Sequence, residues 1–390
     1  MPSYRYAART RRMENPIIRQ LLRLGQREGV ISLAGGIPAA ETFPIPEIAE
    51  ASERVLARWK SRALQYSPTE GLAPLREYIA RRKGVRPEQV LVTSGSQQGL
   101  DLLGRVFLDE GDVVLVESPT YMGALQAWNV YDGRYLEVPT DADGLLPEAL
   151  PGEAPKLAYV LPNFQNPTGS MLPAGRRDEV AAWARRVDTL LVEDDPYGHL
   201  YFAEEPPASL QKRCPDRVVY LGTFSKIVAP GLRMGYAIGP DEIINMMAQA
   251  KQAADLHSQA YGQAILVELA EMGVIERQEE RTRNLYRRRA EIMLEHLGKY
   301  LPDGVSWSPP RGGMFVWLTL PEQVNTLELF EEAVEKGVAY VPGPVFSASG
   351  GLANSLRLTF VSVPEEQMEE GVRRLAEAFE EAINHGESDT

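Results

Sequence analysis

Lys226 stands where a lysine can carry out covalent chemistry. It belongs to the motif TFSK, in a turn between an apolar run at 218–221, which predicts a buried strand, and a second strand predicted at 234–238. Turns at strand ends carry the chemistry of open α/β sheets. A lysine in a partly dry pocket loses its proton more easily and can attack a carbonyl, which suits a Schiff base with an aldehyde cofactor. The alternative is an ordinary solvated lysine in a loop.

A strand, a small turn and a helix follow one another at residues 91–107 in a pattern that suits a phosphate. The run LVT ends at Ser94-Gly95-Ser96, and a helical pattern with one apolar face follows. Backbone N–H groups and hydroxyls at the positive end of a helix bind anions. The candidate phosphate ligands are therefore Gly95, Ser96 and Gln97. An ordinary helix N-cap is the alternative.

Two more buried strands are expected to end in polar side chains. The run KLAYVLP at 156–162 leads to Asn166-Pro167-Thr168-Gly169, for which a plain Asn-Pro turn is the alternative. The run TLLV at 189–192 leads to three acids and then Tyr197. Buried acids are costly unless they are paired, and a protonated pyridine nitrogen would be such a partner. The alternatives are an exposed acidic turn and a metal site, but the histidines are scattered without ligand spacing, so we expect no metal.

In their order along the chain, these motifs resemble those of the pyridoxal-phosphate aminotransferases of fold type I, in the class I and II group. The resemblance covers residues 15 to 380. The segments AGGIPAAETFP (34–44), ALQYSPTEG (63–71) and TSGSQQGLD (93–101) look closest to the 2-aminoadipate and kynurenine aminotransferase branch. The motifs NPTG, EDDPY, TFSK and LRLTF add to the resemblance. It implies pyridoxal 5'-phosphate as the cofactor. It also implies a large α/β domain, with a mostly parallel seven-stranded sheet between helices, and a smaller α/β domain.

The resemblance also implies the roles of the cofactor-binding residues. Lys226 would hold the cofactor and act as general base, and Asp194 would pair with the pyridine nitrogen while Asp195 is only its neighbour. Tyr197 and Asn166 would bond the phenolic oxygen. Tyr121 would stack on the ring. The phosphate would be bound by Gly95, Ser96, Gln97, Thr223, Ser225 and Arg233, with threonine at 223 where the family usually has serine.

Four further residues are expected to act on the substrate or across a subunit boundary. In the family, Arg357 in SLRLTF grips the substrate α-carboxylate, with Asn166 and Gly36 beside it. Tyr66 matches a residue that reaches the neighbouring subunit's cofactor phosphate, which implies a homodimer with composite sites. Arg19 lies in a predicted amphipathic helix that begins near Asn15, and it would meet the side-chain carboxylate of an acidic substrate. A solvated helix charge is the alternative for Arg19.

The elements that must position these residues follow from the pattern of the chain. Residues 51–284 alternate strand and helix signals, which predicts the large cofactor-binding domain. Residues 285–390 predict a small C-terminal domain with strands at 313–320 and 355–361 and a final amphipathic helix, and residues 1–50 are expected to join it. A chain of 390 residues, 44% of them hydrophobic, can form two such cores.

Charge and cysteine content exclude several classes of partner. The net charge of −13 argues against binding nucleic acid or anionic membranes. One cysteine, Cys214, excludes an intrachain disulfide and suits a reducing cytoplasm. No run has the apolar core of a signal peptide or the length of a membrane span, so we expect a cytoplasmic protein.

Three functional hypotheses are compatible with the motifs. The first is an aminotransferase that moves the amino group of 2-aminoadipate, glutamate, or an aromatic or branched-chain amino acid to a 2-oxo acid such as 2-oxoglutarate, by a ping-pong mechanism. The second is another reaction of the same cofactor, such as a β-lyase or decarboxylase, because the scaffold does not fix the outcome. The third is a non-enzymatic ligand sensor, which is disfavoured because the full catalytic set is present.

Overall fold

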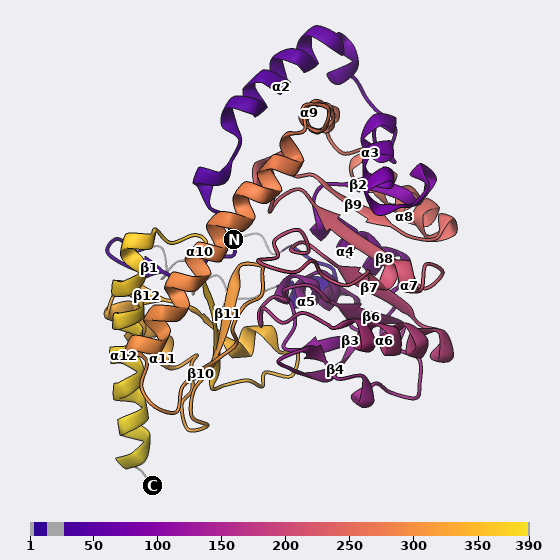
Figure 1. Cartoon of the computed structure of the whole chain (residues 1–390). Helices are drawn as coiled ribbons and strands as arrows, with labels where there is room; N and C mark the ends of the chain where they lie inside the picture. Colours follow the sequence, from indigo (N-terminus) through magenta and orange to yellow (C-terminus); the bar gives the residue numbers. More distant parts are fainter. Residues whose placement is uncertain (1–3, 14–26, 389–390) are drawn as a thin grey trace.

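A sheet of eight strands forms the larger part of the computed structural model, which describes residues 4–13 and 27–388 (Figure 1). The strand order is β2-β9-β8-β7-β6-β3-β4-β5, and only the pairs that involve β9 or the two-residue β5 are antiparallel. The mostly parallel sheet is confirmed, and β5 adds an eighth strand to the seven predicted. The bounds are β2 Val90–Thr93, β3 Val113–Ser118, β4 Arg134–Asp141, β5 Gly144–Leu145, β6 Leu157–Val160, β7 Leu190–Asp194, β8 Val218–Thr223 and β9 Gly235–Ile238.

Strand β8 shows how this sheet is buried on both faces. Val219 and Leu221 pack with α4, α5 and α8, whereas Val218 packs with α6 and α7, and Tyr220 packs with α3 and α9. Alternate side chains of a strand point to opposite faces, so a strand covered on both sides reads as one apolar run. The helices are α2 Ile45–Arg58, α3 Ala73–Lys83, α4 Ser96–Phe107, α5 Met122–Trp128, α6 Ala174–Val187, α7 Leu210–Arg213, α8 Asp241–Asp255 and α9 Ala260–Glu271.

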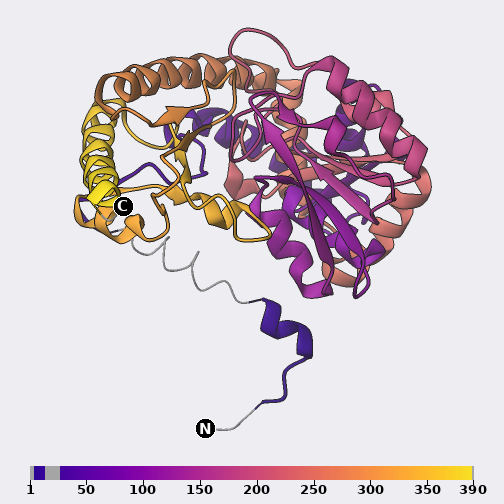
Figure 2. The ribbon, with the colours of Figure 1, turned by 90° about the horizontal axis from the view of Figure 1, so that it is seen from below.

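A smaller body with its own core lies beside the large sheet (Figure 2). It contains an antiparallel sheet in the order β10-β11-β14-β13 and the parallel pair β1-β12. Met368, Val372, Leu375 and Phe379 are buried on one stripe of the last helix, as their spacing predicts. The bounds are β1 Ile31–Ser32, β10 Ser306–Trp307, β11 Phe315–Thr319, α11 Leu329–Glu335, β12 Val338–Ala339, β13 Val341–Pro342, β14 Ser355–Thr359 and α12 Glu365–Ser388.

One long helix, α10 (Val274–Tyr300), connects the two bodies (Figure 1). Ile275 packs in the core of the large body, and Leu297 packs in the core of the small one. The pairing of β1 with β12 attaches residues 31–32 to the small body. The domain boundaries expected near residues 50 and 284 fall inside α2 and α10, and the division stays a prediction. Among the described residues, no helix has both the length and the apolar character needed to cross a membrane.

Candidate active site

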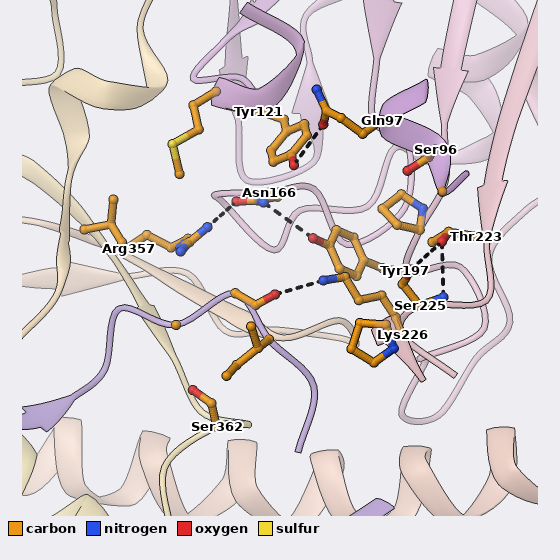
Figure 3. Close-up of a pocket in the computed structure, with 18 of the residues that line it drawn as sticks. Ser96, Gln97, Tyr121, Asn166, Tyr197, Thr223, Ser225, Lys226, Arg357 and Ser362 are labelled. Carbon is orange, nitrogen blue, oxygen red and sulfur yellow. Dashed lines mark hydrogen bonds between the residues drawn. The ribbon is translucent and has the colours of Figure 1, made fainter. Parts of the chain in front are cut away.

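A cavity of about 620 Å³ opens at the ends of the parallel strands, next to the small body. Because β3, β6, β7 and β8 are parallel, their carboxyl ends meet at one edge of the sheet. The small body contributes Arg357 from β14, together with Ser32 and residues 34–37. Of the predicted site residues, the cavity is lined by Gly36, Gly95, Ser96, Gln97, Tyr121, Asn166, Asp194, Tyr197, Thr223, Ser225, Lys226, Arg233 and Arg357. Figure 3 shows most of these side chains around one space.

Lys226 belongs to the turn that follows β8, and its amine lies inside this cavity. Its Nζ donates a hydrogen bond of 2.8 Å to the carbonyl oxygen of Gly36, which belongs to the segment after β1 (Figure 3). Burial lowers the pKa of Lys226 to about 8, and the positive charges of Arg357 and Arg233 act in the same direction. Asp194 opposes this shift. A substantial fraction of the amine is therefore neutral near physiological pH, as a nucleophile or a general base requires.

The three consecutive acids at the end of β7 have three different surroundings. Glu193 accepts hydrogen bonds from the backbone N–H groups of residues 210 and 211, at the start of α7. Asp195 accepts one from the backbone N–H of Gly198, at 2.8 Å, and one from the hydroxyl of Tyr220, at 2.8 Å. Only Asp194 lines the cavity, because alternate residues of a strand face opposite sides.

Asp194 has one satisfied and one unsatisfied carboxylate oxygen. Its Oδ2 accepts a hydrogen bond of 2.7 Å from the hydroxyl of Tyr159. Its Oδ1 is buried and has no hydrogen-bond partner among the residues that the structure describes. Burial raises the pKa of Asp194 to about 7, and the Tyr159 hydrogen bond opposes this rise. A buried carboxylate oxygen without a donor is costly, so this atom is suited to a ligand that brings an N–H or a positive charge.

The turn between β2 and α4 forms a cradle of backbone atoms. Gly95 has φ +77° and ψ 167°, a conformation open essentially only to glycine, and a Cβ there would lie 2.5 Å from Nη2 of Arg233. The Arg233 guanidinium lies against this turn, where its Nη2 donates to the carbonyl oxygen of Ser94 at 3.3 Å, and it lines the cavity. The hydroxyls of Thr223 and Ser225, which are 3.0 Å apart, also line the cavity (Figure 3). Helix N-terminal N–H groups, an arginine and two hydroxyls suit a phosphate group.

Arg357 presents a buried guanidinium on the side of the cavity opposite this cradle. It donates to Oδ1 of Asn166 at 2.8 Å (Figure 3). It also donates to the carbonyl oxygen of Ala34 at 2.7 Å, and it lies 4.2 Å above the ring centre of Phe315. Burial lowers its pKa to about 10, so it remains charged at neutral pH. Asn166 in turn donates to the Tyr197 hydroxyl at 3.4 Å. A planar cation held in this way can bind a carboxylate through two parallel hydrogen bonds.

One predicted site residue that the structure describes, Tyr66, does not line the cavity. The Tyr66 side chain is 77% exposed, and its ring lies edge-on to His257 at 5.7 Å. This position allows the predicted contact with a neighbouring subunit, which stays a prediction. Arg19 and the helix predicted around it lie outside the described residues.

Sequence reasoning missed several residues that shape the site. The carbonyl of Ala34 accepts from Arg357, Tyr159 bonds Asp194, and Ile37, Met122, Tyr340 and Val341 line the cavity. The only sequence signal for Tyr159 was its position in an otherwise apolar strand. A buried tyrosine hydroxyl there needs a hydrogen-bond partner. The apolar lining residues carry no such signal. In residues 4–13 and 27–388, no three His, Cys, Asp or Glu side chains are grouped as they would be to hold a metal ion.

Comparisons with known proteins agree with this geometry. Residues 28–375 match the family described as aminotransferase class I and II. A 2-aminoadipate transaminase of Thermus thermophilus is 46% identical over 376 residues, which cover 94% of each chain. Aromatic-amino-acid aminotransferase 1 of Thermococcus litoralis is 43% identical over 382 residues, covering 94% of this chain and 92% of that one. The crystal structure of an alpha-aminoadipate aminotransferase from Thermus thermophilus, complexed with N-(5'-phosphopyridoxyl)-L-leucine, is similar with a TM-score of 0.91 and 43% identity, covering 97% of this chain and 98% of that one.

Proposed function

The chain belongs to the class I and II aminotransferases, which depend on pyridoxal phosphate, and we propose that it moves the amino group of an L-amino acid to 2-oxoglutarate in two half-reactions, with 2-aminoadipate among its donors. The observation that carries this proposal is the Oδ1 atom of Asp194, which has no hydrogen-bond partner in the described part of the chain and lies in the same cavity as the amine of Lys226 and the guanidinium of Arg357. A β-lyase or decarboxylase would use the same cofactor, so the products decide between these reactions.

The residues of the cavity fit pyridoxal phosphate at both ends of the molecule. The unpartnered Oδ1 of Asp194 can accept from a protonated pyridine nitrogen. The cradle at Gly95, which a Cβ would fill, and Arg233 can hold the phosphate. Between them, Lys226 would bind the aldehyde carbon, Tyr121 would cover the ring, and the remaining contacts would come from Ser96, Gln97, Asn166, Tyr197, Thr223 and Ser225.

The bound cofactor supplies an electron sink that makes the Cα–H bond of an attached amino acid acidic. Arg357, with Asn166 beside it, would hold the α-carboxylate and so orient the Cα–H bond toward Lys226. The Lys226 amine would then remove the proton from Cα and return it to the carbon that had carried the aldehyde oxygen. Because its pKa is lowered to about 8, this amine can both accept and release the proton near neutral pH.

The lining of the cavity supports a broad range of donors. Ile37, Met122 and Val341 are apolar and suit leucine, phenylalanine or kynurenine. Within the described residues, the cationic side chains that line the cavity are Lys226, Arg233 and Arg357, and each already has a proposed role. The second carboxylate of 2-aminoadipate or glutamate therefore needs another partner, for which Arg19 is our proposal.

We also propose how the chain assembles and where in the cell it acts. We expect a homodimer in which Tyr66 reaches the partner's cofactor phosphate, since this exposed side chain has no role in its own cavity. The only cysteine, Cys214, is a free and buried thiol, which is compatible with the proposed cytoplasmic location.

A donor panel tests the proposed reaction. The holoenzyme would be incubated with 2-oxoglutarate and, separately, with 2-aminoadipate, leucine, phenylalanine or kynurenine. We expect glutamate to form together with an equal amount of the donor's 2-oxo acid. Release of ammonia or of CO₂ from any of these donors, without glutamate formation, would contradict the proposal and favour a lyase or a decarboxylase.

A further inference from the structure

Tyr159 occupies a fixed position behind Asp194. It lies on β6, next to β7 in the sheet, and its side chain is completely buried. The Trp128 indole and the Tyr159 ring pack edge to face, with ring centres 5.5 Å apart and planes at 89°. Trp128 is itself held by a hydrogen bond of 2.9 Å from its Nε1 to the carbonyl oxygen of Leu100 in α4. The Tyr159 hydroxyl therefore has little freedom to follow a movement of the acid.

The hydroxyl of Tyr159 bonds one carboxylate oxygen of Asp194 and leaves the other oxygen available to a ligand. It donates to Oδ2 at 2.7 Å, and Oδ1 is left without a partner in the described residues. A hydrogen bond to a carboxylate is stronger than one between neutral groups and favours the ionised acid. Burial and the nearby Asp194 charge raise the pKa of Tyr159 well above its usual range, so the phenol keeps the proton that it donates.

We propose that Tyr159 is a positioning residue, which acts through Asp194 to hold the free carboxylate oxygen in line with the pyridine nitrogen of the cofactor. This inference rests on the proposed role of Asp194 opposite that nitrogen. Tyr159 does not line the cavity and does not need to touch the cofactor. Its effect should therefore depend on the ring nitrogen and should disappear when that nitrogen is absent.

The test compares two ligands on one substitution, Tyr159→Phe. The ligands are pyridoxamine phosphate, which binds without a covalent bond to Lys226, and its carbocyclic analogue, in which a C–H replaces the ring nitrogen. Dissociation constants are measured by calorimetry on the cofactor-free full-length chain. We expect Tyr159→Phe to weaken the binding of pyridoxamine phosphate by about tenfold, the scale of one hydrogen bond to a charged group, and to change the binding of the analogue less than about twofold. Equal losses for both ligands would show a merely structural role and would overturn the proposal, as would no loss for either.

Two controls separate this inference from the proposed function. Tyr286→Phe also removes one buried hydroxyl, which accepts from the Ala39 backbone N–H in the small body, and it should leave both affinities unchanged. Asp194→Asn should weaken the binding of pyridoxamine phosphate but not that of the carbocyclic analogue. If it does not, the proposed role of Asp194 fails; if it does and Tyr159→Phe does not, the Tyr159 proposal alone fails.

A second substitution keeps the proposal testable if Tyr159→Phe does not fold. Trp128→Phe keeps the Tyr159 hydroxyl and removes part of the packing that fixes its ring. It should weaken the binding of pyridoxamine phosphate by about two- to fivefold, which is less than the effect of removing the whole hydrogen bond. The binding of the carbocyclic analogue should not change. An equal loss of affinity for both ligands, or no loss for either, would again contradict the proposal.

Discussion

Burial shifts the pKa of three ionisable side chains that line the cavity, Lys226, Asp194 and Arg357. It lowers the pKa of Lys226 to about 8 and raises that of Asp194 to about 7, so each group is close to its titration point at neutral pH. Arg357 keeps its charge because its pKa, lowered to about 10, is still far above neutrality. A base that can give up its proton again and a permanent cation for a carboxylate are what amino transfer needs.

The pKa of Lys226 predicts how cofactor capture depends on pH. Only the neutral amine attacks an aldehyde, and the neutral fraction rises as pH passes upward through the pKa. We expect the rate at which the cofactor-free protein captures pyridoxal phosphate to increase with pH with a midpoint near 8. Stopped-flow absorbance measures this rate. A midpoint near 10.5, the ordinary value for lysine, would show that the cavity does not perturb this amine.

Neighbouring acids should respond very differently to the same substitution. Asp194→Asn removes the charge that faces the cavity, and we expect kcat/KM to fall roughly a hundredfold or more, as for the loss of one partner from a buried charged pair. Asp195→Asn instead disturbs the bonds to Gly198 and Tyr220, so it should lower the melting temperature and spare most of the activity. Steady-state kinetics and thermal unfolding of both variants check this, and equal losses of activity would mean that the wrong acid has been assigned.

At the scale of elements, the turn between β2 and α4 should be intolerant of a side chain at one position. Gly95→Ala places a Cβ against Arg233, so we expect the affinity for pyridoxamine phosphate to fall about tenfold or more, the scale of one charged hydrogen bond, with little change for unphosphorylated pyridoxamine. Gly84→Ala is the matched control, because Gly84 also has a positive φ, of +71°, but has no atom within 4 Å of a Cβ built there. Calorimetry on both variants checks this. A similar loss of affinity for both ligands in Gly95→Ala, or a similar loss in Gly84→Ala, would exclude a phosphate cradle at Gly95.

The strand ends were predictable from the sequence because buried parallel strands are continuous apolar runs that stop at small or polar residues. The sequence therefore predicts Gly95, Asn166, Asp194 and Lys226 at strand ends, and all four line the same cavity at one edge of the sheet. The bond from Tyr159 to Asp194 was not predictable, because it depends on the register between β6 and β7. Helix α10 starts at Val274, before the domain boundary expected near residue 284. This start was missed because apolar residues that pack on the large body carry no mark of a boundary.

At the scale of the whole molecule, the position of Tyr66 predicts active sites shared between two copies. A mixture of Tyr66→Phe and Lys226→Ala subunits should form hybrid dimers with one intact site each. Once Tyr66→Phe alone has been shown to be impaired, the activity after reassociation should exceed the mean of the two separate variants, because the intact site combines Lys226 of one chain with Tyr66 of the other. Activity that stays at that mean after confirmed subunit exchange would place Tyr66 outside the site.

The most direct test of the whole account is a half-reaction followed without any acceptor. The holoenzyme is mixed with excess L-2-aminoadipate, and the cofactor absorbance and the 2-oxo acid are measured together, with Lys226→Ala as the matched control. We predict that the wild-type protein converts its cofactor to the pyridoxamine form with one 2-oxo acid formed per site, and that later addition of 2-oxoglutarate restores the original absorbance and yields glutamate. Lys226→Ala should show neither change. An unchanged wild-type cofactor with every donor of the panel, or conversion at a comparable rate in Lys226→Ala, would contradict amino transfer through this lysine.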